Sequence, residues 1–305
     1  PEDQHELARY GARARSDCSL IAGGHLVQVD LSSGILSLRD LADPSQLSLV
    51  GSTTVKLGSS CTLTKDGPWL YAAGSTGLTV IDIQDPAAPR PRGSLPLGGE
   101  PRQLVVDGGS LYLAAGSEGL WTVDVSRPDA PAVLGHMATP GYSSGLVADS
   151  DRLYLADGPA GLTVVDVADP TSPREVEALL PGEEIVAIAR RGDWFYASGV
   201  HRSQPGAGVY LAELITLHRS GPLRVQSRWP LDGGSEGNQA LDAGTGTDLY
   251  VQDGAGGIRW LDVSAGLPQS RDLLASDTTL TGLVAGEGWV LSSGESQRLL
   301  RRDGP

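Results

Sequence analysis

Short apolar runs alternate with glycine, proline and aspartate along nearly the whole chain. In one representative stretch, apolar runs at 104–106, 111–115, 120–125 and 132–136 are separated by turn-forming residues. Runs of this length that are rich in β-branched and aromatic residues, and are broken about every 8 to 12 residues, predict strands. No part of the chain keeps a helical period over three turns, so we expect an all-β protein. Each segment like the one at 104–136 would contribute four strands.

The pattern repeats at a fixed interval. A glycine opens the third apolar run at Gly77, Gly119 and Gly161, a spacing of 42 residues. A repeat of roughly 40 to 50 residues is typical of propeller blades or solenoids. Because each unit contains four antiparallel strands and no helix, the repeat favours a β-propeller.

The number of second strands predicts the number of blades. They begin at Leu26, Leu70, Leu111, Leu153, Phe195, Leu249 and Trp289. The last unit ends in its third strand, near Leu299 to Arg302, whereas the segment from Glu6 to Tyr10 resembles a fourth strand. The sequence therefore predicts one domain, residues 1–305: an all-β, seven-bladed β-propeller of four-stranded antiparallel blades. The N-terminal strand would complete the last blade and close the ring, leaving no exposed strand edge.

Two segments carry a family resemblance. Gly-Leu-Thr-Val-Ile-Asp-Ile-Gln-Asp-Pro-Ala-Ala-Pro at 77–89 and its counterpart at 161–173 resemble the LVIVD-repeat family of bacterial and archaeal propellers. The match is strong in blades two to four and weak in blades five to seven, where Asp-Pro is lost. The resemblance implies a cell-surface or other extracytoplasmic propeller, typically without a known reaction.

Charge and hydropathy narrow the function classes. The net charge of −14 argues against a nucleic-acid partner, which requires a basic surface. No apolar stretch reaches 18 residues, so we expect no membrane span. Because the chain begins at Pro1, we expect that a signal segment has been removed, which agrees with a periplasmic, cell-surface or secreted location.

The two cysteines occupy equivalent positions in consecutive blades. Cys18 precedes Leu20 by two residues, and Cys61 precedes Leu63 by two. The first strands of neighbouring blades are on the order of 6 to 8 Å apart, which overlaps the range that a disulfide spans. Equivalent positions also point the same way around the ring, which opposes bridging. A disulfide and a pair of buried thiols therefore both remain open.

The sequence offers no catalytic, cofactor-binding or metal-binding set. The five histidines lie in different units without ligand spacing. The aspartates before proline, Asp43, Asp85 and Asp169, are expected to cap turns rather than to bind calcium. The tyrosine that recurs in the second strands is expected to be a packing residue.

Departures from the repeat indicate the binding surface. The interval from the glycine that ends the second strand to the glycine that opens the third grows from three residues to nine in blade five, from Gly199 to Gly208, and the connection at 228–239 is also longer. We expect both insertions on one face, where repeat proteins bind partners. The predicted partner-binding residues are His201, Arg202, Gln204, Trp229, Asp232 and Glu236, with Arg102 and Tyr142 nearer the axis.

The sequence thus favours a non-catalytic, extracytoplasmic scaffold that binds another protein of the bacterial envelope or cell surface. One alternative is an enzyme with an axial active site, which needs an acid–base pair where the first strands begin. Those positions read Cys18, Cys61, Arg102, Ser144, Val186, Gln239 and Thr281. A structural subunit of a surface assembly is the other alternative.

Overall fold

The structure, a computed structural model, describes residues 6–10, 18–43, 46–202, 210–231, 241–242, 247–252, 258–274, 282–286, 289–293 and 297–301. The described residues form strands and turns, as the alternating pattern predicted. Contacts between Cα atoms divide the chain into two compact units. The N-terminal unit comprises Arg13–Asp157 and Leu162–Leu179, and the C-terminal unit comprises Pro1–Ala12, Gly158–Gly161 and Leu180–Pro305.

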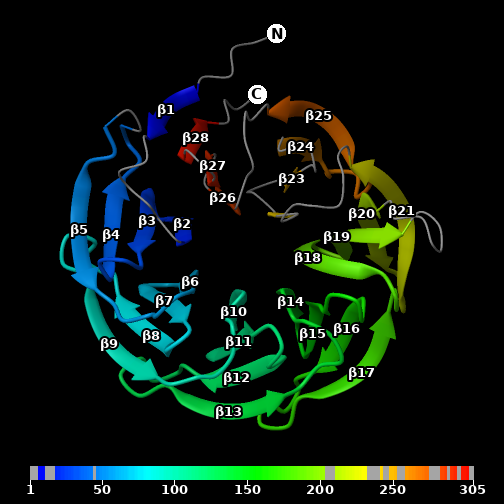
Figure 1. Cartoon of the computed structure of the whole chain (residues 1–305), viewed down its shortest axis with the longest axis horizontal. Helices are drawn as coiled ribbons and strands as arrows, with labels where there is room; N and C mark the ends of the chain where they lie inside the picture. Colours follow the sequence, from blue (N-terminus) through cyan, green and yellow to red (C-terminus); the bar gives the residue numbers. More distant parts are fainter. Residues whose placement is uncertain are drawn as a thin grey trace. The chain divides into compact units, whose positions relative to one another are not determined.

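The N-terminal unit contains four antiparallel sheets, each made of four consecutive strands (Figure 1). The strands of the first two sheets are β2 (Cys18–Ala22), β3 (His25–Asp30), β4 (Ile35–Asp40), β5 (Leu49–Thr54), β6 (Cys61–Asp66), β7 (Trp69–Gly74), β8 (Gly77–Asp82) and β9 (Arg90–Leu95). Those of the next two are β10 (Gln103–Asp107), β11 (Ser110–Ala114), β12 (Leu120–Asp124), β13 (Ala132–Met137), β14 (Gly145–Asp149), β15 (Arg152–Ala156), β16 (Leu162–Asp166) and β17 (Arg174–Leu179). The first strands β2, β6, β10 and β14 are neighbours in this order, so consecutive sheets pack face against face.

The C-terminal unit contains two more sheets of the same construction. Their strands are β18 (Glu184–Arg191), β19 (Trp194–Arg202), β20 (Tyr210–Arg219), β21 (Leu223–Leu231), β22 (Leu241–Asp242), β23 (Asp248–Gln252), β24 (Ile258–Asp262) and β25 (Gln269–Leu274). A further sheet combines β1 (Glu6–Tyr10) with β26 (Gly282–Gly286), β27 (Trp289–Ser293) and β28 (Gln297–Arg301) in the order β1-β28-β27-β26. Tyr10 pairs with Gln297, so the expected antiparallel pairing of the two chain ends is found.

The predicted seven-bladed propeller is corrected by this topology. Within the described residues, six blades of this all-β structure consist of four consecutive antiparallel strands each. The remaining four-stranded sheet is composite, because it takes one strand from the N-terminus and three from the C-terminus. The sequence prediction counted second strands and expected the N-terminal strand to complete the last unit, so it counted this composite sheet as a seventh blade.

Apolar side chains from neighbouring sheets form the core. In the N-terminal unit, Val29 and Leu38 of one blade join Leu70 and Ile81 of the next in a single buried cluster. The second-strand tyrosines are buried, as predicted: Tyr71, Tyr112, Tyr154, Tyr196 and Tyr250. Burial of both sheet faces explains why the strands read as nearly continuous apolar runs.

A glycine in the fourth strand brings consecutive blades of the N-terminal unit into backbone contact. A Cβ on Gly51, Gly93 or Gly135 would lie 2.2 Å, 2.4 Å or 3.0 Å from the carbonyl oxygen of the proline 35 residues later, Pro86, Pro128 or Pro170 respectively. These glycines and prolines each recur at the repeat interval. We call each pair a glycine–proline junction.

Aspartates that end the third strands form the turns that follow. The Asp82, Asp124 and Asp166 carboxylates accept hydrogen bonds from the backbone N–H two residues later, at 3.0 Å, 2.9 Å and 3.0 Å. The predicted capping by aspartates before proline is confirmed at Asp85 and Asp169, which accept from the N–H of Ala87 and Thr171. These carboxylates therefore have a structural role in shaping the turns.

Candidate interaction surface

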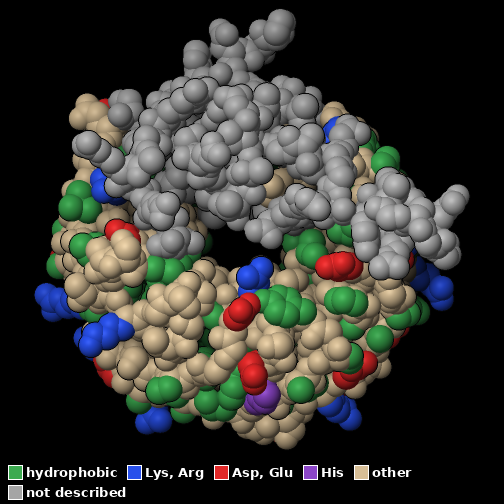
Figure 2. Space-filling view, viewed as in Figure 1, with side chains coloured by type: hydrophobic (Ala, Val, Ile, Leu, Met, Phe, Trp, Pro, Cys, Tyr) green, Lys and Arg blue, Asp and Glu red, His purple; other side chains and the backbone are tan. Residues whose placement is uncertain are grey.

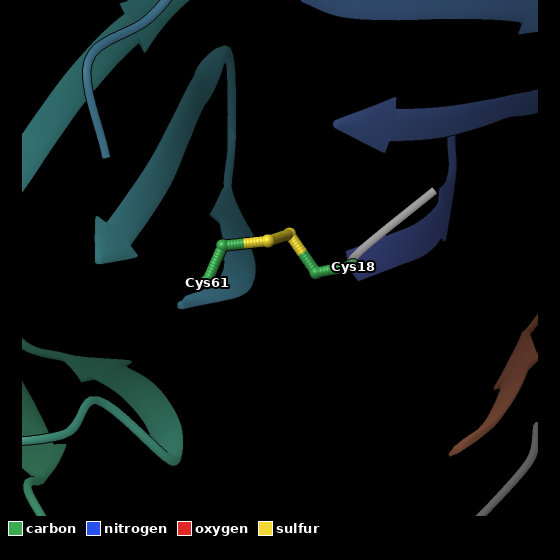
Figure 3. The surroundings of a disulfide bond; sticks show 2 residues. All are labelled: Cys18 and Cys61. Carbon is green, nitrogen blue, oxygen red and sulfur yellow. A yellow bond between two sulfur atoms is a disulfide. The ribbon is translucent and has the colours of Figure 1, made fainter. Parts of the chain in front are cut away.

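The two cysteines are bonded to each other. Cys18 begins β2 and Cys61 begins β6, and a disulfide joins their sulfur atoms with the Cα atoms 5.8 Å apart (Figure 3). Since β2 and β6 are neighbouring first strands, the bond links two consecutive blades at their first residues. Of the two alternatives that the sequence left open, the structure has the disulfide.

Arg102, Glu100 and Tyr142 form a cluster in the same unit. Arg102 immediately precedes β10, and Tyr142 lies in the connection that leads to β14. The Tyr142 hydroxyl donates a hydrogen bond to the Glu100 carboxylate, and the Arg102 guanidinium carbon lies 5.7 Å from the centre of the Tyr142 ring. Over the ends of β10 and β14, Figure 2 shows a basic side chain beside an acidic one and hydrophobic surface.

The Tyr142 ring rests on the preceding blade. A Cβ on Gly116, whose φ is +61°, would lie 2.9 Å from the ring, so only glycine leaves room for it. Gly116 and Ser143 exchange two backbone hydrogen bonds of 3.0 Å and 3.1 Å, which hold the Tyr142 segment in place. Burial raises the pKa of Tyr142, the hydrogen bond to Glu100 raises it further, and the nearby Arg102 charge lowers it. The hydroxyl therefore stays protonated and continues to donate to Glu100.

A buried carboxylate stabilises the connection that carries Tyr142. Asp157 is fully buried and accepts hydrogen bonds from the hydroxyls of Thr139 (2.7 Å), Ser143 (2.8 Å) and Thr163 (3.1 Å) and from the N–H of Gly141 (3.0 Å). Four donors around one carboxylate provide the stabilisation that a buried charge requires. The connection that carries Tyr142 is thus anchored at three of its residues.

The Arg102 side chain has N–H donors that no described residue accepts. Its backbone N–H bonds to Ala114 at 2.8 Å, and the side chain is exposed. No described residue forms a hydrogen bond or ion pair with its guanidinium. A guanidinium held over an aromatic ring with free donors can bind a carboxylate in bidentate fashion.

Trp229, one of the predicted partner-binding residues, is partly buried. It lies on β21 opposite Leu214 of β20, is half-buried, and packs against a core cluster that includes Ala212, Leu231 and Leu249. Its contacts are therefore those of a packing residue as well as of a surface residue.

Beside Trp229, Arg228 forms an ion-pair group. Its guanidinium bonds to Glu183 at 2.6 Å and 2.8 Å and to Glu213 at 3.0 Å. The hydrogen bonds to Glu183 raise the pKa of Arg228 well above its usual value. These donors are already occupied, which leaves Arg228 less able than Arg102 to bind an external anion.

The blade-five insertion is partly strand. The sequence placed Val200 to Ala207 in a loop, but β19 continues to Arg202, with Val200 opposite Ala212, His201 opposite Leu211 and Arg202 opposite Tyr210. The side chains of His201 and Arg202 lie outside the described residues, as do Gln204, Asp232 and Glu236 entirely. The structure thus brings together Arg102 and Tyr142, adds Glu100, which the sequence did not indicate, and leaves this second set as a prediction.

An axial catalytic pair is not formed by the described residues at the first-strand positions. Cys18 and Cys61 are bonded to each other, Val186 has no titratable group, and the Ser144 hydroxyl donates to the Ala156 carbonyl at 3.1 Å. In the part of the chain that the structure describes, no three metal-ligating side chains gather at one place. Among the same residues, no helix has the length and hydropathy needed to cross a membrane.

Comparison with known protein families identifies the repeat. The LVIVD repeat matches residues 58–95, 98–139 and 140–180. No curated protein sequence matches the chain significantly.

Solved propellers resemble the whole chain. The Cps50 (Swd1) β-propeller domain of Myceliophteria thermophila has a TM-score of 0.73 at 12% identity, covering 99% of this chain and 100% of that one. The WD40 domain of Toxoplasma gondii coronin has a TM-score of 0.72 at 13% identity, covering 98% and 84%. BamB of Moraxella catarrhalis has a TM-score of 0.61 at 13% identity, covering 99% and 98%. At these identities the likeness shows the fold alone. Together with the three matched repeats, it identifies the chain as a β-propeller that carries LVIVD repeats.

Proposed function

We propose that this propeller is a non-catalytic, extracytoplasmic scaffold that binds another protein of the bacterial envelope or cell surface. The observation that carries the proposal is the Arg102–Tyr142 pair, because the guanidinium is exposed, has no described acceptor and lies over a fixed aromatic ring. A side chain that is already ordered loses little entropy on binding, so the pair is suited to a carboxylate on the partner surface.

The disulfide supports the proposed location. Disulfides form and persist in oxidising compartments and are rare in the reducing cytoplasm. Cys18 and Cys61 are the only cysteines in the chain, and both are in the bond. The resemblance to LVIVD propellers implies the same side of the membrane.

Affinity capture from the source envelope tests the proposal. The baits are the wild-type chain, the Arg102→Ala variant and the Arg127→Ala variant, a control that removes another exposed arginine of the same unit. We expect quantitative mass spectrometry to find a protein retained by wild type and by Arg127→Ala and reduced at least about tenfold with Arg102→Ala, since central arginines are frequent interface anchors. Equal retention by all three baits would remove Arg102 from the contact.

The location is tested separately. Fractionation of source cells, followed by mass spectrometry without reduction, should find the chain outside the cytoplasm with Cys18 and Cys61 linked. A cytoplasmic chain with two free thiols would contradict the proposed compartment.

A further inference from the structure

A hollow of about 390 Å³ opens beside the last residues of β5 and the β8–β9 pair, all within the N-terminal unit. This volume lies within the range of known ligand sites. Its lining includes Thr54, Lys56, Thr79, Ser94 and Leu95, and we call the hollow the Lys56 groove.

The backbone of the groove is firmly held. The Thr76 hydroxyl donates to the Lys56 carbonyl at 2.7 Å, and the Val55 N–H donates to the Gly34 carbonyl at 2.8 Å. The Leu95 carbonyl lies so close to Gly77 that a Cβ there would be 2.2 Å away. The site therefore exists before any ligand binds, which lowers the cost of binding.

The groove is open because two positions depart from the repeat. On β8 and β9 the cross-strand pair is Thr79 and Ser94, whereas the pair 42 residues later, on β12 and β13, is Trp121 and His136. The Trp121 and His136 rings stack with centroids 4.2 Å apart, and the Trp121 ring lies 3.9 Å from the place where a Cβ on Gly98 would be. Small side chains leave the space empty in one blade, and aromatic rings occupy it in the next.

The position equivalent to Lys56 in the next blade is Gly98. The groove therefore has a positive charge that the next blade lacks. The chain has 37 aspartates and glutamates, yet none of them lines the groove. Lys56 is exposed, and no described residue forms an ion pair or hydrogen bond with its ammonium group. The groove is thus a locally cationic site on an acidic protein.

We propose that the Lys56 groove binds a short, extended, acidic segment of a partner protein. A carboxylate of the segment pairs with Lys56, the hydroxyls of Thr54 and Ser94 supply hydrogen bonds, and an aliphatic side chain packs on Leu95. Pro91 and Pro96 have no N–H to donate, so the segment is held mainly by side chains rather than as an added strand. This site goes beyond the proposed function, because it is a different surface from the Arg102–Tyr142 pair.

Binding of synthetic peptides tests the charge complementarity. The probe is a fluorescent hexapeptide pool of Asp, Glu, Leu, Ile and Pro, and the comparison pool replaces the acidic residues by Lys and Arg. We expect the acidic pool to bind wild type saturably and to lose at least about tenfold in affinity with Lys56→Glu. Lys65→Glu is the matched control, because it makes the same charge change at the other lysine, on β6 of the same unit. We expect its affinity to stay near that of wild type.

Two further variants separate the groove from other surfaces. Thr79→Trp combined with Ser94→His places the next blade's aromatic pair in the groove and should abolish binding while the melting transition stays cooperative. Arg102→Ala should leave peptide binding unchanged, so failure here and failure of the proposed function give different results.

Lysine acylation provides a readout that does not depend on any variant. Because Lys56 and Lys65 are the only lysines, the acidic pool should protect Lys56 from acylation and leave Lys65 reactive. The proposal is overturned if the acidic pool shows no saturable binding at about 1 mM, if the basic pool binds equally well, or if the two lysine variants behave alike.

Discussion

Single glycines decide how closely neighbouring blades approach. At Gly93 a Cβ would meet the Pro128 carbonyl oxygen at 2.4 Å and the Pro131 side chain at 2.5 Å, so any larger residue forces backbone apart. We expect Gly93→Ala to lower the free energy of unfolding by about 1 to 3 kcal/mol, measured by urea denaturation. The control is Gly98→Ala, where the nearest contact of a Cβ is an ordinary 3.9 Å. Equal stability of the two variants would show that the junction relaxes without cost.

Buried Tyr196 makes stability sensitive to high pH. Its hydroxyl donates to the Gly266 carbonyl at 2.8 Å, and burial raises its pKa to about 12, above the usual value near 10. Because the folded-state pKa is raised, this contribution to stability is complete below about pH 10 and is lost as the pH rises towards 12. Urea unfolding from pH 8 to 11 should show stability falling above about pH 10, and Tyr196→Phe should show a smaller fall. An unchanged slope in the variant would assign the loss to another group.

At the scale of the strands, the disulfide ties one blade to the next. It closes a loop with a sequence separation of 43 residues, for which chain entropy predicts about 4 kcal/mol of stabilisation. We expect the double variant Cys18→Ser, Cys61→Ser to unfold at correspondingly lower urea concentration, with wild type in reductant behaving in the same way. A double variant as stable as the oxidised wild type would mean that the first strands hold together without the bond.

The order of the strands and the positions of the turns could be predicted, because short sequence patterns within each repeat determine them. The glycines that open the third runs have positive φ at Gly77, Gly119 and Gly161, which explains why the same residue recurs there. The extension of β19 to Arg202 was missed because pairing with β20 depends on register, which glycine spacing alone does not define. The Lys56 groove was missed for a similar reason: Thr79 and Trp121 are equivalent in sequence, but only the packed sheets show that the smaller residue leaves a hollow.

At the scale of the whole molecule, the two ends of the chain share one sheet. Removing residues 1–12 should leave β28 with an unpaired edge, because β1 pairs with it from Glu6 to Tyr10. We expect the truncated chain to melt at a lower temperature and to self-associate, as measured by calorimetry and light scattering. A truncated chain that melts at the wild-type temperature and stays monomeric would show that β1 does not protect this edge.

The number of blades was the part of the fold least accessible from sequence. Blades two to four could be recognised from matching phrases, and the three family matches fall in this stretch, at 58–180. Beyond it the Asp-Pro phrase is lost, and strands such as β20, with ten residues, are longer than their counterparts of five or six residues in blades two to four. Of the interaction residues, Arg102 and Tyr142 were inferred from their position near the first strands, whereas Glu100 could be found only from its contact with Tyr142.

The glycine–proline junctions bear on how such a chain can grow. Each blade between β6 and β13 supplies a proline to the blade before it and a glycine to the blade after it, at a constant offset along the sequence. A gene segment of one repeat length therefore encodes one junction glycine and one junction proline, wherever within the repeat the segment begins. Tandem duplication or loss of such a segment leaves every remaining junction complete, so blade number can change in evolution, or by recombinant design, without a compensating substitution at the seam.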